Sequence, residues 1–319
     1  MPQNHSRYAL PVSGLVVALV AAGGGWLPPW IVSISTVALG DGLAVLGMIV
    51  LWRSGLVSFG QALYYATGAY GVALAARHLG LRDAFLLVLI GTFTAGLLAY
   101  VVGFLLARYR GIFFAMLSLA LSMILYGVLI NSQILGASDG LSVPRATFGG
   151  FGPRGDDYGW ALFALVLAAA WLSAVAAERY STTIAGSLST PLIDNELRIE
   201  FLGVSANRLI HLKVVIAGVL TGMGGSIVGL SVAHVDPTMS FWTTSGGFVF
   251  VAILAGTASV WGAFVGALAY AGIRTFAIAT VPGTWQMIIG TALLLTILFV
   301  PQGLGGLIYR RRRALGAKQ

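Results

Sequence analysis

Residues 178–213 read ERYSTTIAGSLSTPLIDNELRIEFLGVSANRLIHLK, and apolar sequence borders them on both sides. Eight of the 28 charged residues of the chain fall in this one stretch. The neighbouring segments, at about 158–177 and from 209 onwards, are instead rich in Leu, Ala, Val and Gly. We therefore expect this polar segment to lie in water between two membrane-like segments and to contact another molecule there.

The composition of the whole chain indicates a membrane protein. Of its 319 residues, 58% are hydrophobic and 9% are charged, and its mean hydropathy is +0.92. A soluble domain carries about 25% charged residues, so lipid is the expected solvent. The long apolar runs do not alternate as barrel strands do, and only helices or closed barrels span a bilayer. We predict an all-α, polytopic transmembrane helical bundle that forms a single domain over residues 1–319.

The apolar runs give the number of membrane spans. A transmembrane helix needs roughly 20 apolar residues. Ten segments are candidates, at about 10–27, 31–52, 56–76, 84–107, 111–131, 158–177, 209–232, 245–258, 261–281 and 284–300. The first is expected to be a retained span, because no small-residue cleavage site follows it as in a signal peptide. The segment 245–258 is short, and is either a half-helix or continuous with its neighbour, so we predict eight to ten spans.

The basic residues indicate the orientation, because lysine and arginine collect on cytoplasmic loops. If all ten segments cross and the N-terminus is cytoplasmic, thirteen basic residues lie inside and four lie outside. The inner set is Arg7, Arg53, Arg108, Arg110, Arg179, Arg198, Arg208, Lys213, Arg310, Arg311, Arg312, Arg313 and Lys318, and the outer set is Arg77, Arg82, Arg145 and Arg154. This assignment places residues 178–213 and both termini in the cytoplasm, and the Gly- and Pro-rich loop 132–157 outside. The net charge of +8 then reflects topology, so we expect a lipid bilayer and no nucleic acid as its partner.

The signatures of enzymes are missing from the sequence. There is no cysteine, no HExxH pair and no GxSxG elbow. A Walker A loop needs Gly-Lys-Ser/Thr, but Lys213 follows Leu212 and Lys318 follows Ala317. His234 and Asp236 are two ligands, whereas a catalytic zinc site uses three protein ligands. We therefore expect no catalytic residue, no metal and no cofactor in this chain, and ATP, if it is used, to be hydrolysed by another chain.

Two ionisable residues fall inside predicted spans, namely Asp41 and Arg274. Such residues are rare in spans and are often functional. They can pair with each other or face the bundle interior. They also leave an alternative open, in which the chain is a self-sufficient secondary transporter or channel that uses Asp41 and Arg274.

Within the polar segment, the sequence predicts one short helix over Pro191–Gly203. Ser189 or Thr190 can cap it, Pro191 suits its first turn, and Gly203 is a natural stop. Its length of about 12 residues corresponds to roughly 18 Å, which is too short to cross a membrane.

The side chains of this helix favour a protein partner. Asp194 and Glu196 suit the N-terminal end of the helix dipole, and Asp194 and Arg198 form an i,i+4 pair. Lipid-surface helices prefer basic polar faces, but this one has Asp194, Glu196 and Glu200 against one arginine. An apolar stripe that can enter a groove on a partner consists of Ile193, Leu197, Phe201 and Leu202.

Several stretches resemble one transporter family. They are GLVSFGQALYYATGAY at 55–70, GIFFAMLSLALSMILYGV at 111–128, GASDGL at 136–141, IDNELRIEFLGVSANRLIHLKVVIAGVLTGMGGSIVGLSVAHVDP at 193–237 and VPQGLGGL at 300–307. In this order, from about residue 38 to residue 307, the chain resembles the permeases of high-affinity branched-chain amino acid ABC transporters, of the LivM type.

The resemblance implies a permease subunit in the bacterial inner membrane that imports branched-chain amino acids. It implies four kinds of partner: a second homologous permease, two cytoplasmic ATPase subunits that bind ATP and Mg, a periplasmic substrate-binding protein and the bilayer. The coupling helix of the family would be Pro191–Gly203, and its acidic-Asn-Glu core matches Asp194, Asn195 and Glu196. The residues implied in ATPase coupling are therefore Pro191, Asp194, Asn195, Glu196, Arg198 and Gly203.

Other residues that match the family, or differ from it, bear on the path and the identity of the solute. Residues expected near the translocation pathway or a docking surface are Ser58, Gln61, Tyr70, Ser138 and Asp139. Helix packing explains the first three equally well. The family usually has arginine near the positions of Ser187 and Ile193, so this chain is a divergent branch. Its solute is then expected to be a branched-chain amino acid or a related small amide, urea-like compound or aromatic acid.

Overall fold

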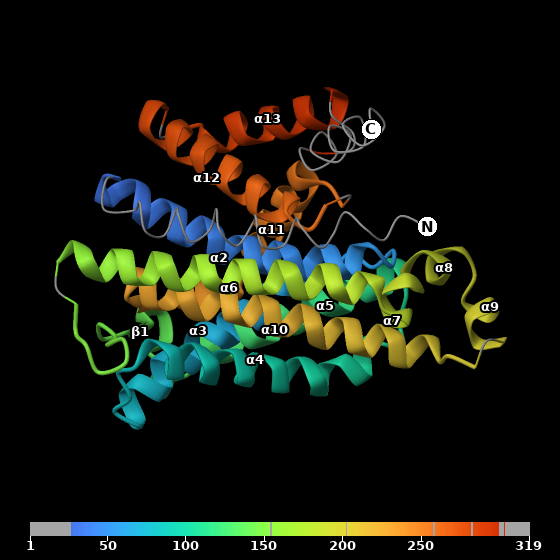
Figure 1. The fold of residues 1–319 in the computed structure, drawn as a ribbon, viewed down its shortest axis with the longest axis horizontal. Helices are drawn as coiled ribbons and strands as arrows, with labels where there is room; N and C mark the ends of the chain where they lie inside the picture. Colours follow the sequence, from blue (N-terminus) through green and yellow to red (C-terminus); the bar gives the residue numbers. More distant parts are fainter. Residues whose placement is uncertain are drawn as a thin grey trace, which may run out of the picture.

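Long helices run along the longest axis of the molecule and form a bundle (Figure 1). The computed structural model describes residues 27–153, 155–201, 203–257, 259–281, 283–299 and 303, without the side chains at 156, 190, 194, 198 and 297. Within these ranges the main helices are α2 (Pro29–Trp52), α3 (Gln61–His78), α4 (Ala84–Leu106), α5 (Gly111–Asn131), α6 (Asp156–Thr182), α10 (Ala206–Val232), α11 (Trp242–Ala255), α12 (Gly262–Thr280) and α13 (Trp285–Phe299). The prediction of an all-α polytopic bundle is confirmed.

The helices follow the predicted segments. The first predicted span, 10–27, lies outside the described residues, and each of the other nine segments forms a helix. Six helices in the described ranges are long and apolar enough to cross a membrane, namely α2, α4, α5, α6, α10 and α12. The helices α11 and α13 are shorter. That the chain forms a single domain stays a prediction.

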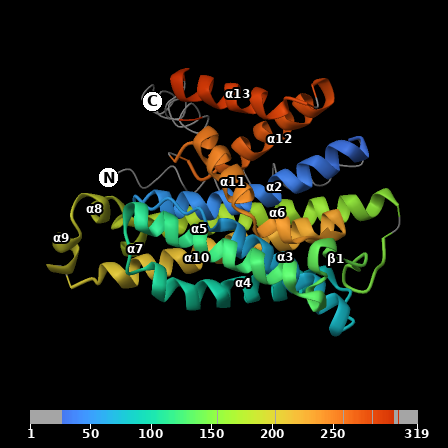
Figure 2. The ribbon, with the colours of Figure 1, turned by 180° about the vertical axis from the view of Figure 1, so that it is seen from behind.

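The two ends of the bundle differ in structure. At one end, called here the α9 end, lie three short helices, α7 (Ile184–Ser187), α8 (Ser189–Asp194) and α9 (Glu196–Phe201) (Figure 2). At the other, called the β1 end, the strands β1 (Leu141–Ser142) and β2 (His234–Val235) pair antiparallel. The predicted irregular loop at this end also contains the short 3-10 helices η2 (Gln133–Leu135) and η3 (Ala137–Asp139).

Helix α10 is the centre of the bundle, because small residues let α2, α3 and α4 approach it closely. A Cβ atom built on Gly68 of α3 would lie 2.1 Å from the carbonyl oxygen of Gly222, and one on Gly222 would lie 2.1 Å from the Cβ of Ala95 in α4. A Cβ on Gly225 would lie 2.0 Å from the carbonyl oxygen of Tyr65. Backbones this close give the dense packing that membrane helices use in place of the hydrophobic effect.

Two helices, α3 and α11, begin in the middle of the bundle and run in opposite directions. Near the start of α3, the backbone N–H of Ala62 donates a hydrogen bond to Ser245 Oγ in the first turn of α11, at 2.9 Å. From there α3 continues toward the β1 end. The C-terminal end of α11 leads toward the α9 end, where Arg53 Nε donates to the carbonyl oxygen of Thr257 at 3.0 Å. Of the two alternatives for residues 245–258, the structure shows a separate short helix of 14 residues, whereas the segment 56–76 begins its helix only at Gln61.

Serines of α5 bind the chain where it enters these two half-helices. Ser118 Oγ accepts a hydrogen bond from the N–H of Phe59 at 3.1 Å, and Ser122 Oγ donates to the carbonyl oxygen of Ser240 at 2.7 Å. Ser240 ends the 3-10 helix η4 (Pro237–Ser240) that precedes α11. A helix that begins away from water leaves backbone groups unpaired. The buried hydroxyls supply part of that pairing, which stabilises an interruption inside the membrane region.

Candidate functional site

The polar segment between α6 and α10 is shorter than predicted and folds into three short helices. Residues 178–182 belong to α6, and α10 begins at Ala206. The predicted single helix over Pro191–Gly203 is wrong, because Asn195 has an extended conformation (φ −164°, ψ 106°) between α8 and α9. Asparagine leaves helical conformations readily, because its side chain can bond to nearby backbone groups. Pro191 is the third residue of α8, which begins at Ser189.

Buried side chains and one ion pair fix α8 and α9 to the bundle. Leu192 and Ile199 are buried in a hydrophobic cluster that also contains Leu209 of α10. Glu196 forms an ion pair with Arg110 at the start of α5. Arg110 also donates a hydrogen bond to Asn207 Oδ1 in α10 at 2.7 Å. Glu196, predicted as an ATPase-coupling residue, therefore joins α9 to the start of α5, and through Arg110 to the first turn of α10.

The opposite side of these helices presents apolar side chains to solvent. Phe201 is 89% exposed, Leu197 64% and Ile193 55%. Gly203 ends α9 with φ +82°, and its N–H donates to the carbonyl oxygen of Glu200 at 2.9 Å. The predicted stop at Gly203 agrees with this geometry, whereas the predicted single stripe is divided between α8, which carries Ile193, and α9, which carries Leu197 and Phe201. Leu202 lies outside the described residues.

The structure says less about the other residues that were predicted in or near the coupling helix. The side chains of Asp194 and Arg198 are outside the described part of the structure, so their i,i+4 pair stays a prediction. At the two positions where the resemblance implies arginine, Ser187 Oγ donates to the carbonyl oxygen of Ile184 at 2.9 Å, and Ile193 faces Gly55 in the turn after α2.

Lys213, counted from the sequence as a charge of the polar segment, is fully buried in α10. Its ammonium group donates hydrogen bonds to Ser189 Oγ in α8, at 2.6 Å, and to Ser54 Oγ in the turn after α2. A charge taken out of water is stable only when it is paired with polar groups. Lys213 therefore joins three elements at the α9 end.

The residues expected near a pathway lie at different depths. Ser58 and Gln61 are buried beside the start of α3, where Ser58 Oγ accepts from the N–H of Gly60 at 3.2 Å and Gln61 Oε1 accepts from Thr221 at 2.7 Å. Tyr70 is buried further along α3. Gln61 Nε2 and the Tyr70 hydroxyl have no hydrogen-bond partner among the described residues.

Ser138 and Asp139 are exposed at the β1 end, where Ser138 Oγ donates to Asp139 Oδ1 at 3.2 Å. The structure therefore brings Ser58 and Gln61 together, but places Ser138 and Asp139 apart from them.

Asp41 of α2 and Arg274 of α12 lie in neighbouring helices. The hydroxyl of Tyr65 donates a hydrogen bond to Asp41 Oδ1 at 2.8 Å. The guanidinium of Arg274 lies 5.6 Å from the centre of the Trp285 ring in α13. Of the two alternatives for these residues, a direct ion pair between Asp41 and Arg274 is not formed in the described part of the chain.

The comparisons with known proteins agree with this architecture. The family model described as "Branched-chain amino acid transport system / permease component" matches residues 30–298. The chain belongs to this permease family. It is similar to the high-affinity branched-chain amino acid transport system permease protein LivM of Escherichia coli strain K12, with 24% identity over 317 residues, 91% of this chain and 74% of the relative. LivM of Salmonella typhimurium is 25% identical over 290 residues, which cover 84% of this chain and 67% of that protein. No solved structure matches the chain.

Membership of this family makes the permease a membrane transport component and not an enzyme, and it confirms the resemblance to LivM. Within the described ranges, no group of three His, Cys, Asp or Glu side chains could hold a metal ion. His234 pairs with Ser142 in the β1–β2 ladder, and Asp236 Oδ1 accepts from the N–H of Thr238 at 2.8 Å. Both residues therefore have structural partners at the β1 end.

Three kinds of contact between the helices of the permease could not be predicted from the sequence. The sequence predicts Arg110 only as a cytoplasmic charge, whereas the structure shows that it holds α9 to α5 and α10. The sequence predicts Lys213 in the polar segment, whereas the structure places it fully buried in α10. The serines Ser118, Ser122 and Ser245 were overlooked, although a hydroxyl inside an apolar run is itself a signal of a buried backbone contact.

Proposed function

We propose that the permease is the transmembrane subunit of an ATP-driven ABC importer. Its solute is a branched-chain amino acid or a related small amide, urea-like compound or aromatic acid, moved inward across a bacterial inner membrane. The observation that carries the proposal is the pair Leu197 and Phe201, which are exposed on a helix that is itself fixed to the bundle. An apolar surface on a short anchored helix suits a groove on a partner protein.

The partners follow from this assignment. The sequence lacks a Walker A loop, so two separate cytoplasmic ATPase subunits bind ATP and Mg and contact α9. A second homologous permease completes the membrane unit, and a periplasmic binding protein delivers the solute at the β1 end. The excess of basic residues toward the α9 end supports a cytoplasmic position for that end and for both termini.

Motion passes from α9 into the bundle through its anchors. When the ATPases close, they displace the exposed side chains of α9. The Glu196–Arg110 ion pair and the burial of Ile199 transfer that displacement to the first turns of α5 and α10. Lys213 extends the connection to α8 and to the turn after α2. Helix α5 is hydrogen-bonded to the residues that precede α3 and α11. A shift of α5 therefore moves both half-helices, and the solute pathway changes from open to the outside to open to the inside.

A self-sufficient secondary transporter that uses Asp41 and Arg274 is the competing function. It would need no ATPase, and it leaves the exposed apolar side chains of α9 without a role. Asp41 and Arg274 are also compatible with a solute site in an ATP-driven permease.

Uptake in proteoliposomes separates the two functions. We expect labelled L-leucine to enter vesicles that contain the complete transporter and binding protein only when ATP is supplied on the α9 side. Vesicles that contain the permease alone are expected to show no uptake, with or without a proton or sodium gradient. Gradient-driven uptake by the permease alone would overturn the proposal.

A further inference from the structure

We propose that the cleft between α11, α12 and α13 binds one anionic phospholipid, with an acyl chain along its apolar wall and the phosphate group at Arg274. The phospholipid belongs to the leaflet at the β1 end of the bundle. The site does not depend on the proposed function, because lipid surrounds the permease whichever energy source drives transport.

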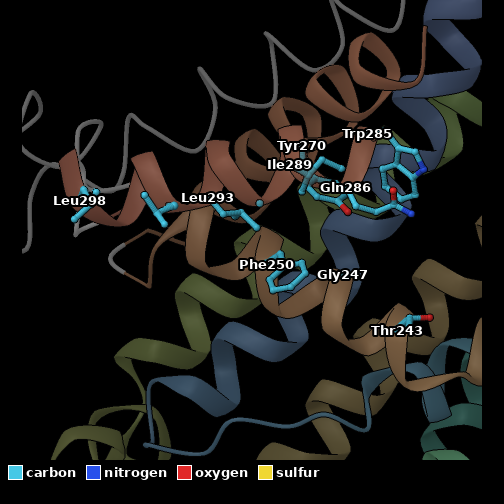
Figure 3. Close-up of a pocket in the computed structure, with 11 residues that line it drawn as sticks. Thr243, Gly247, Phe250, Tyr270, Trp285, Gln286, Ile289, Leu293 and Leu298 are labelled. Carbon is cyan, nitrogen blue, oxygen red and sulfur yellow. The ribbon is translucent and has the colours of Figure 1, made fainter. Parts of the chain in front are cut away.

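The cleft is a long apolar groove with a volume of about 850 Å³. Ile289 and Leu293 of α13 lie along one wall, and Phe250 of α11 faces them (Figure 3). The lining of α13 extends from Trp285 to Leu298, which corresponds to about 20 Å of helix. One leaflet contributes about 15 Å of the hydrocarbon core of a bilayer. The groove is therefore long enough for one acyl chain.

Two glycines keep the groove open. Gly247 of α11 and Gly290 of α13 both line it. A Cβ atom built on either glycine would meet no atom within 4 Å among the described residues. Room is therefore left directly beside the two helix backbones, where a linear acyl chain can lie.

The Trp285 end of the groove lies toward the β1 end of the bundle. Just before α12, Trp261 Nε1 donates a hydrogen bond to Glu178 Oε1, at 2.8 Å, close to the end of α6 from which α7 to α9 follow. Helix α12 therefore runs toward the β1 end, and α13 returns from it (Figure 1). Arg274 lies about 9 Å before the end of α12 at Thr280. Long arginine side chains cover such a distance by extending toward the headgroup region.

Arg274 supplies the charge that a lipid phosphate requires. It is an exposed cation in a helix that is long and apolar enough to cross a membrane. It does not line the groove itself, but its guanidinium lies 5.6 Å from the centre of the Trp285 ring, which does. Among the described residues no carboxylate forms an ion pair with Arg274. A charge at membrane depth is usually paired, and guanidinium groups bind phosphate by strong, often bidentate, hydrogen bonds.

Charge also selects the occupant of the groove. The described lining contains no acidic side chain, and the predicted span at 10–27 has no acidic residue that could pair with Arg274. A phospholipid brings both the missing anion and the apolar chain. A zwitterionic headgroup carries its own cation, which competes with Arg274 for the phosphate, so an anionic headgroup is preferred. Trp285 and Tyr270 suit this end of the groove, because aromatic side chains favour the level of the headgroups.

Photocrosslinking from the lipid tests the site. The full-length permease, purified with the subunits that accompany it, is placed in nanodiscs that contain a photoreactive phospholipid with a diazirine on one acyl chain. Phosphatidylglycerol and phosphatidylcholine with the same acyl chains are compared at equal concentration, and peptide mass spectrometry locates the adducts. We expect adducts on α13 near Leu293, about tenfold more from phosphatidylglycerol, as one added charged hydrogen bond produces.

Substitutions at the two ends of the lipid separate headgroup from acyl chain. We expect Arg274→Gln to lower the phosphatidylglycerol adducts on α13 about tenfold, to the level of phosphatidylcholine. The matched control is Arg77→Gln, because Arg77 is exposed toward the β1 end and lies outside the groove. We expect Gly290→Leu to remove the α13 adducts of both lipids, because the new side chain fills the groove. Its control is Gly272→Leu, since Gly272 also has open space around it but does not line the groove.

Adducts on the lipid-facing side of α4, near the exposed Phe93, show that each variant is folded in the bilayer. Equal α13 adducts from the two lipids, or a preference for phosphatidylglycerol that persists in Arg274→Gln, would overturn the site. Adducts on α4 with none on α13 would overturn it as well, because residues 10–27 or a second permease would then cover the groove.

Discussion

A Phe201→Asp substitution is expected to abolish ATP-driven uptake while the permease stays folded. Phe201 is 89% exposed at the end of α9, so an aspartate there costs the isolated permease little. In the assembled transporter, the same carboxylate would be buried without a partner against the ATPase. An unpaired buried charge costs roughly 3–5 kcal/mol, which lowers the affinity for the ATPase by about a hundredfold or more.

Co-purification of the ATPase subunits and uptake in proteoliposomes measure this effect. The matched control is Ile134→Asp, because Ile134 is 75% exposed at the β1 end. We expect Ile134→Asp to retain both the ATPase subunits and ATP-driven transport. Normal ATPase retention by Phe201→Asp would contradict the role of α9 as the contact surface.

A Gly68→Ala substitution is expected to have the largest effect on stability. The added methyl group would lie 2.1 Å from the carbonyl oxygen of Gly222, and backbone cannot move aside as a flexible side chain can. Helix α3 would have to separate from α10, the helix around which the bundle is packed. Overpacking of this kind costs roughly 1–3 kcal/mol and sometimes more, and we expect the upper end here.

Thermal unfolding of the detergent-purified permease tests this expectation. The control is Gly127→Ala in α5, where an added Cβ would meet no atom within 4 Å in the described structure. Alanine is the better helix former, so this control is expected to melt at the same or a slightly higher temperature. If Gly68→Ala and Gly127→Ala unfold at the same temperature, the contact between α3 and α10 is looser than described.

The spans could be predicted from the sequence, because lipid requires long apolar helices with satisfied backbone groups. The start of α3 could not be predicted from the sequence. The predicted segment 56–76 contains no charged residue, and its hydropathy does not show that the helix begins only at Gln61. That start depends on hydrogen bonds to Ser118 and Ser245, which are distant in sequence.

In the polar segment 178–213, exposed residues could be predicted from the sequence, but tertiary contacts could not. The exposed apolar residues of α9 follow from their spacing, and their exposure agrees with the prediction. The break at Asn195 and the burial of Lys213 depend on tertiary contacts with α5, with α10 and with the turn after α2. A count of charges along the sequence therefore placed Lys213 in water, although it is one of the buried anchors.

Crosslinking from position 201 tests most directly whether α9 contacts an ATPase. The chain has no cysteine, so Phe201→Cys provides a unique attachment point for a photoreactive maleimide in native membranes. We expect irradiation to join the permease to an ATPase subunit from Phe201→Cys and not from Ile134→Cys. Crosslinks from position 201 to lipid alone, or equal ATPase crosslinking from both positions, would contradict the account.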